Sequence, residues 1–158
     1  MARELEKLKT AILNEVQGRR FYTSAAEQAQ NPDVKEAFLH LAADEQKHET
    51  WLRTLYDDIK QKQEGRVYNT DDYFRLPGIF SKKNVPAAND LEITVYFIGI
   101  LLEEASAKFY REAAEGETPE VAALLNKLAT WEDGHKNALQ QRYDELQAEW
   151  LRKEGLAE

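Results

Sequence analysis

Apolar residues recur along most of this chain at alternating intervals of four and three, the pattern that places side chains on one face of a helix. Four stretches with this pattern predict four helices, over about 3–29, 32–63, 90–116 and 119–153. We call the apolar row of each helix its seam. The seam is clearest in the second helix, where it runs through Val34, Phe38, Leu41, Glu45, His48, Leu52, Leu55 and Ile59.

Short polar motifs mark the expected helix boundaries. Asn31-Pro32-Asp33 and Thr118-Pro119-Glu120 each provide a capping side chain, a proline at the first helical position and an acid in the first turn. Glycines end the second and fourth helices, at Gly65 and Gly155. Four helices of this length, each with one apolar seam, predict an all-α four-helix bundle.

Two glycines and two prolines interrupt the helical pattern between residues 65 and 89. A connector of about 25 residues is long for a compact domain and can cross the length of a bundle. The second and third helices therefore need not be antiparallel neighbours. We expect a single domain in which a helical hairpin over 3–64 and another over 90–153 are joined by a crossover over 65–89.

Each predicted helix carries a glutamate on its otherwise apolar seam. A single Glu interrupts the first and third seams, and a Glu-x-x-His motif interrupts the second and fourth. A buried carboxylate without a partner costs several kcal/mol, so these acids need a compensating charge. A metal ion is the most economical compensator for a carboxylate and an imidazole one helical turn apart. The candidate metal ligands are Glu15, Glu45, His48, Glu103, Glu132 and His135.

The two predicted hairpins repeat each other, and the repeat decides which acids correspond. Residues 12–22 read ILNEVQGRRFY and residues 100–110 read ILLEEASAKFY, which pairs Glu15 with Glu103 and leaves Glu104 outside the candidate set. The two Glu-x-x-His motifs fall at matching positions as well. The repeated unit is therefore a helical hairpin that carries one Glu and then one Glu-x-x-His.

Charge and ligand type together suggest two metal ions. Four inward carboxylates carry a charge of −4, which two divalent ions balance. Carboxylate and imidazole ligands suit iron or manganese. One Glu from each of two helices and a Glu-x-x-His from each of the other two is the ligand set of ferritin-like di-iron and di-manganese bundles. We therefore expect a ferritin-like bundle that binds two iron ions, with manganese possible.

The chain also resembles the rubrerythrin branch of the ferritin-like superfamily. The resemblance rests on the two Glu-x-x-His motifs, the long crossover, and a Tyr seven residues after the first-helix and third-helix Glu, at Tyr22 and Tyr110. It covers nearly the whole chain outside the connector and the final turns. It implies a non-haem di-iron oxidoreductase whose reduced metal centre reacts with peroxide or dioxygen.

The same resemblance implies a role for each candidate ligand. The motif glutamates, Glu45 and Glu132, would bridge the two metals. One further Glu and one His would complete each metal: Glu15 with His48, and Glu103 with His135.

Two departures from the family pattern bear on the reaction. Rubrerythrins proper carry a rubredoxin-like electron-transfer domain, which this chain cannot build because it has no cysteine. The resemblance then implies that electrons come from a separate donor protein. Rubrerythrins also have an additional Glu one turn beyond the third-helix ligand, where this chain has Ser106. Peroxidase, oxidase and ferroxidase reactions therefore all stay open.

Composition restricts the kinds of partner that this protein is expected to have. A net charge of −8 without a basic cluster argues against nucleic acid. The longest mainly apolar run, residues 93–102, is too short to span a bilayer, so no membrane association is expected. The first residues are charged and lack an apolar signal region, which predicts a cytoplasmic location. We expect a homodimer.

Three further side chains could hydrogen-bond to the ligands, namely Tyr22, Tyr110 and Asp44. The two tyrosines could equally be core aromatics. Asp44 precedes the first motif, but its counterpart in the repeat is Trp131. Two alternatives to the oxidoreductase are kept: a ferroxidase or iron-storage protein within a larger shell, and a metal-free helical interaction module in which the motifs are structural Glu–His pairs.

Overall fold

The computed structural model describes residues 2–61 and 90–158, which form four α-helices. These are α1 (Ala2–Gln28), α2 (Pro32–Lys60), α3 (Asp90–Ala114) and α4 (Pro119–Lys153). The predicted four-helix, all-α fold is confirmed, and each boundary lies within three residues of its expected place. No helix in the described ranges combines the length and apolar character needed to cross a membrane.

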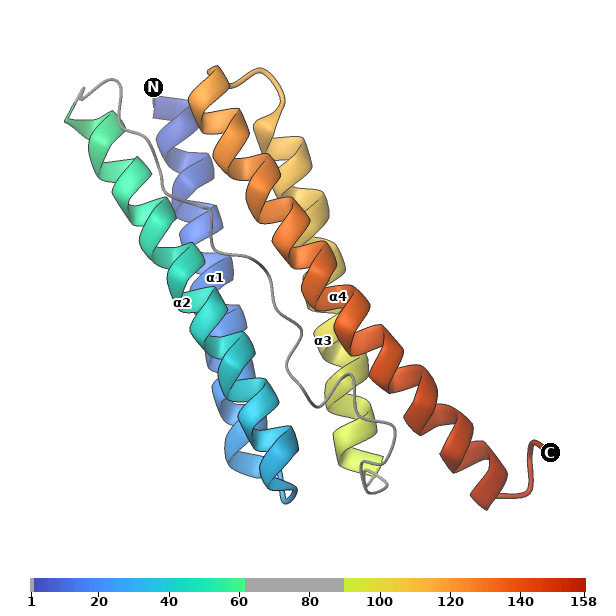
Figure 1. Ribbon diagram of the computed structural model, residues 1–158. Helices are drawn as coiled ribbons and strands as arrows, with labels where there is room; N and C mark the ends of the chain where they lie inside the picture. The colour runs from blue at the N-terminus through green and yellow to red at the C-terminus, as the bar shows by residue number, and fades with distance from the viewer. Residues whose placement is uncertain (1, 62–89) are drawn as a thin grey trace.

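The four helices form two antiparallel hairpins that pack side by side, α1 with α2 and α3 with α4 (Figure 1). Between the hairpins the backbone of α1 lies against that of α3 and the backbone of α2 against that of α4, whereas α2 and α3, in the described residues, meet only through side chains such as Phe38 and Tyr96. Helix α2 ends and α3 begins at opposite ends of the bundle (Figure 1), so these two helices run in the same direction. The predicted connector over 65–89 lies outside the described residues.

The two cap-proline-acid motifs behave differently. The side chain of Asn31 accepts hydrogen bonds from the backbone N–H groups of Asp33 (2.8 Å) and Val34 (3.4 Å), as a helix cap does. Thr118 occupies the corresponding position before α4, but its side chain makes no capping hydrogen bond. The predicted side-chain cap is therefore correct for α2 and wrong for α4.

The seam of α2 is buried as predicted from Val34 to Leu55, and Ile59 at its end is partly buried. Apolar seam residues of all four helices fill the interior in two clusters, one toward each end of the bundle. Trp150 follows the buried Leu146 at the four-residue spacing of a seam, which predicts burial on the same face of α4, but it is 39% exposed. Helix α4 has 35 residues against 25 to 29 in the others, so its last turns have fewer partners to pack against.

Replacing Asn31 by Ala should destabilise the fold by about 1 kcal/mol, because two backbone N–H groups at the start of α2 lose their acceptor. Urea denaturation measures the change. Thr118→Ala is the matched control and should cost less than half as much, since Thr118 makes no capping bond. Equal losses in the two variants would contradict this account of the α2 cap.

Candidate metal centre

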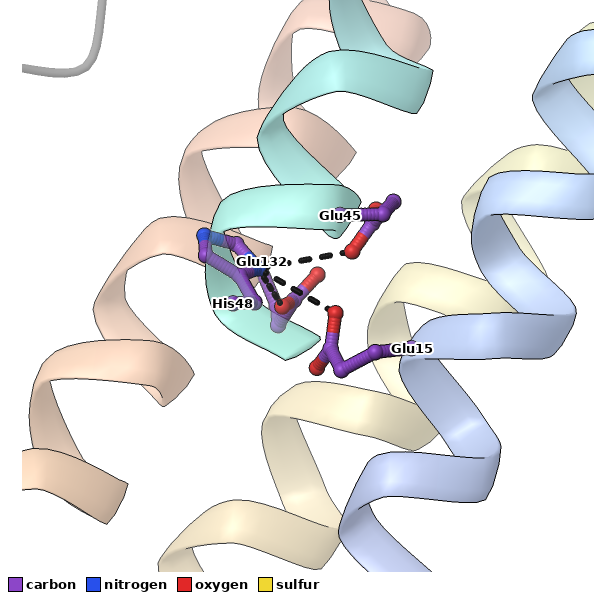
Figure 2. A group of neighbouring side chains, drawn as sticks. All are labelled: Glu15, Glu45, His48 and Glu132. Carbon is purple, nitrogen blue, oxygen red and sulfur yellow. Dashed lines mark ion pairs between the residues drawn. The ribbon is translucent and has the colours of Figure 1, made fainter. Parts of the chain in front are cut away.

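The six predicted ligands come together in the middle of the bundle, between the two apolar clusters. They form two overlapping groups whose ligand atoms lie within 4.8 Å of one another, and all six side chains are buried. Glu45 and Glu132 belong to both groups. Figure 2 shows one group, with Glu15 from α1 and Glu132 from α4 pointing toward the motif residues of α2. The groups are Glu15, Glu45, His48 and Glu132, and Glu45, Glu103, Glu132 and His135.

Each histidine turns its Nδ1 atom toward three carboxylates. His48 Nδ1 lies 3.3 Å from Glu15 Oε2, 3.3 Å from Glu45 Oε2 and 3.0 Å from Glu132 Oε1 (Figure 2). The second histidine repeats this arrangement at slightly longer range. His135 Nδ1 lies 3.5 to 3.6 Å from its three carboxylates: Glu45, Glu103 and Glu132.

These spacings suit a metal ion. Ligand atoms bound at about 2.1 Å and at right angles to one another lie about 3.0 Å apart, close to the distances around His48 Nδ1. Three of the same atoms are buried and have no hydrogen-bond partner among the described residues, as expected of atoms that face a shared ion. They are Glu15 Oε2, His48 Nδ1 and Glu132 Oε1. The residues therefore fit a two-metal site, with Glu45 and Glu132 placed where bridging ligands belong.

Proton uptake reduces the negative charge of this cluster in the metal-free protein. Burial, together with repulsion from Glu132 and Glu45, raises the pKa of Glu15 and that of Glu103 well above the usual range. Burial alone would lower the pKa of each histidine, but neighbouring carboxylates outweigh it and raise the pKa of His48 and His135. The shifts of these four groups therefore all favour their protonated forms, which offsets part of the negative charge of the cluster.

The pKa values of Glu45 and Glu132 shift in the opposite direction. Burial and mutual repulsion act to raise the pKa of Glu45, but interactions with Glu15, His135 and His48 prevail and lower it. The pKa of Glu132 is also lowered, because interactions with Glu103 and both histidines, including the charge of His48, outweigh its burial. The two carboxylates shared by the ligand groups therefore favour the charged form, which attracts a cation.

Glu15 and Glu103, which each belong to only one ligand group, are held by two tyrosines. Each tyrosine comes from the hairpin opposite to that of its glutamate. Tyr22 of α1 donates a hydrogen bond to Glu103 of α3, and Tyr110 of α3 donates to Glu15 of α1. Burial and the adjacent carboxylate raise the pKa of both phenols, so they stay protonated donors. Both predicted tyrosines thus reach the site, and each bonds to the Glu of the other hairpin.

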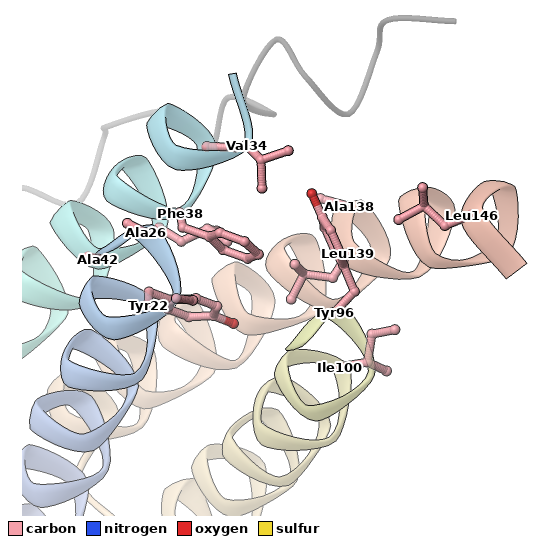
Figure 3. Packing of buried hydrophobic residues seen from close by; sticks show 13 residues of the cluster. Tyr22, Ala26, Val34, Phe38, Ala42, Tyr96, Ile100, Ala138, Leu139 and Leu146 are labelled. Carbon is pink, nitrogen blue, oxygen red and sulfur yellow. The ribbon is translucent and has the colours of Figure 1, made fainter. Parts of the chain in front are cut away.

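Apolar side chains close the bundle on both sides of the ligands. Tyr22 belongs to the cluster in Figure 3, where its ring stacks on Phe38 at 6.2 Å and Phe38 contacts Tyr96 at 5.3 Å. Tyr110 belongs to the cluster at the other end, with Leu52 and Leu128. Each cluster therefore excludes water from one side of the site and contributes one phenol to it.

Asp44 reaches the site through a histidine of the other hairpin. Its Oδ2 atom lies 3.3 Å from His135 Nε2, on the outer side of the ring. Lys47 Nζ contacts Asp44 Oδ1 at 3.3 Å, and His40 lies 3.9 Å away. His40 is about half exposed, as expected for a residue outside the ligand set.

The sequence did not predict the indole rings that surround His48. Trp131 and Trp51 contact the His48 ring at centroid distances of 5.3 and 5.6 Å. The repeat offered one signal, since Trp131 occupies the position of Asp44. Glu49 was missed too; it is buried, but Arg19 at 3.2 Å and Arg53 at 2.8 Å neutralise it.

Helix α1 passes close to Glu45 at Gly18. A Cβ atom at this position would lie 3.5 Å from the carboxyl carbon of Glu45, an ordinary van der Waals contact. A side chain longer than that of alanine would press on the carboxylate that both ligand groups share.

The fold and the ligand cluster define the class: a ferritin-like four-helix bundle with a buried carboxylate–histidine centre. The family model for rubrerythrin matches residues 6–143, so the chain belongs to the rubrerythrin family, a ferritin-like di-iron family. A hypothetical protein from Pyrococcus furiosus is similar in structure, with a TM-score of 0.69, 29% sequence identity, and 94% of each chain covered. No curated protein matches this chain.

The metal-free protein should lose stability as the pH rises from about 5 to 9. The raised pKa values of Glu15, Glu103, His48 and His135 mean that the folded state binds more protons than the unfolded state, so the free energy of unfolding falls with pH. Thermal denaturation with a chelator present measures this. Saturating Mn²⁺ should reverse the trend, because the metal replaces these protons and binds more tightly at high pH. The same downward trend with and without Mn²⁺ would contradict the assignment of these groups as ligands.

Proposed function

We propose that this protein is a non-haem di-iron oxidoreductase that consumes peroxide or dioxygen. The observation that carries the proposal is the pair of overlapping Glu/His groups, buried and joined by two shared carboxylates. Membership of the rubrerythrin family supports iron as the metal, although the ligand set also suits manganese. When bound, two iron ions would supply the electrons that reduce an oxygen–oxygen bond.

The protein's own groups would prepare the site for that chemistry. Glu45 and Glu132 would hold the two ions at a fixed separation, and His48 and His135 would each complete one of them. Tyr22 and Tyr110 fix the remaining two glutamates through hydrogen bonds. The apolar clusters keep bulk water away, which strengthens every electrostatic interaction at the centre.

Reconstitution with iron(II) under anaerobic conditions should give two metal ions per chain, measured by elemental analysis after removal of free iron. Glu45→Ala and Glu132→Ala each remove a ligand common to both groups, so each variant should hold fewer than one ion per chain. Glu104→Ala is the matched control, because Glu104 adjoins Glu103 in sequence but is exposed. Its metal content should equal that of the wild type.

Fewer than two ions bound by the wild type would refute the two-metal proposal. Air or peroxide should also give the oxidised iron protein a near-ultraviolet absorption band, which the Glu45→Ala and Glu132→Ala variants lack. A metal-free helical interaction module, the alternative from sequence, would show neither the band nor any effect of a chelator on thermal stability.

Peroxide turnover separates an oxidoreductase from an iron-storage protein. With a supplied electron donor, the iron-loaded wild type should consume peroxide over many turnovers, whereas Glu132→Ala should lose at least 100-fold in rate because a shared ligand is gone. Peroxide and donor consumption are measured together. A single turnover followed by iron retained in a mineral would favour the ferroxidase and storage alternative.

The partners of the reaction are part of the same proposal. A separate electron-donor protein is proposed because the chain has no cysteine for a rubredoxin-type iron site. A homodimer is proposed as well, supported by a row of exposed apolar side chains on α3 that includes Phe97, Ile98, Leu101 and Leu102. Mass in solution distinguishes the dimer from a storage shell.

A further inference from the structure

The two metal positions of this centre have matched inner ligands. Each has one glutamate of its own, one histidine and the two shared carboxylates. Each non-shared glutamate accepts a hydrogen bond from one tyrosine, Glu15 from Tyr110 and Glu103 from Tyr22. What differs between the positions is the surroundings of the outer nitrogen of each histidine.

The outer nitrogen of His135 has an acidic partner. His135 Nε2 lies 3.3 Å from Asp44 Oδ2, while Nδ1 of the same ring faces the three carboxylates. Lys47 contacts the other oxygen of Asp44 at 3.3 Å, so the carboxylate is held from the outside as well. A carboxylate at this place fixes the tautomer and the orientation of a metal-binding imidazole.

The outer nitrogen of His48 has no hydrogen-bond partner among the described residues. The ring is fully buried, and Trp131 meets it edge to face at 5.3 Å, with an interplanar angle of 88°. The internal repeat places Trp131 where the other half has Asp44. An indole N–H can donate but cannot accept, so Trp131 offers no counterpart to the carboxylate beyond weak contact with its ring face.

Ligation makes this difference matter. A histidine that binds a metal through Nδ1 carries its proton on Nε2, which then needs an acceptor. At His135 that proton points to Asp44, whereas at His48 it is buried against indole rings. Metal binding through His48 therefore leaves a buried N–H group without an acceptor among the described residues, which weakens binding there, whereas His135 has Asp44 as an acceptor.

We infer that the two positions are unequal: the Glu103–His135 position binds a divalent metal first and more tightly, with Asp44 as its positioning residue, and the Glu15–His48 position fills second. The inference rests on the proposed two-metal site. Removing an outer partner of this kind typically costs 10- to 100-fold in metal affinity, and we expect a difference of that size between the positions.

A comparison of single-histidine variants measures the two positions separately. His48→Gln leaves the His135 position intact, and His135→Gln leaves the His48 position intact. Titration with Mn²⁺, with free Mn²⁺ counted from its six-line electron paramagnetic resonance signal, gives the affinity of each remaining position. We expect the His48→Gln variant to bind its first Mn²⁺ 10- to 100-fold more tightly than the His135→Gln variant.

Asp44→Asn and Asp44→Ala test whether Asp44 causes the difference. Each is introduced separately into the His48→Gln protein and into the His135→Gln protein. Either change should weaken Mn²⁺ binding 10- to 100-fold in the His48→Gln protein and less than threefold in the His135→Gln protein. A general loss of structure would weaken both alike, and circular dichroism checks the fold of each variant. Glu104→Ala is the matched control, because Glu104 is exposed and belongs to neither ligand group, and it should change affinity less than threefold.

Equal affinities in the two single-histidine variants would overturn the inference, as would an Asp44 effect of the same size in both. A wild-type protein that binds two Mn²⁺ while the variants show no difference refutes only the inequality. A wild-type protein that binds no Mn²⁺ overturns the inference, and the anaerobic iron(II) reconstitution then decides the two-metal proposal by itself.

Discussion

The structure is organised around four carboxyl groups and two imidazoles that lie close together in the buried interior of the bundle. Like charges this close cannot all be ionised in a medium of low dielectric constant, so the cluster exists either with shared protons or with metal cations. Each helix gives up one or two apolar seam positions to this cluster. The apolar clusters on either side offset that loss, and they also supply the phenols that hold Glu15 and Glu103.

The centre belongs to neither hairpin alone. Each ligand group draws on both hairpins, because Glu45 comes from the first and Glu132 from the second. The tyrosine bonds and the Asp44–His135 contact also cross from one hairpin to the other. Binding of metal at this centre would therefore be linked to the docking of the hairpins, and each would stabilise the other.

The sequence was sufficient to predict the helices and the convergence of the six ligand candidates, for a clear physical reason. A charged residue on an apolar seam is costly, and the repeat supplied a second, independent alignment of every such residue. Periodicity places a residue on a face but does not say which neighbour it meets. That Tyr22 would bond to Glu103, and Asp44 to the histidine of the other hairpin, therefore needed the three-dimensional packing.

The errors have the same origin. Trp150 fits the seam of α4 by spacing, but burial depends on what other helices provide opposite it. Thr118 has the right residue type for a cap, yet its side chain does not make the bond. The tryptophans beside His48 were not predicted because an aromatic residue on a helix near a seam is ordinary core composition.

The depth at which the ligands lie has a kinetic consequence. None of the six residues exposes more than 3% of its surface. A metal ion would then enter or leave only when the structure opens locally, for example along the α1–α3 or α2–α4 contact. The rate of exchange would be governed by the frequency of that opening rather than by the concentration of metal outside, so a loaded protein would keep its ions long after the supply is gone.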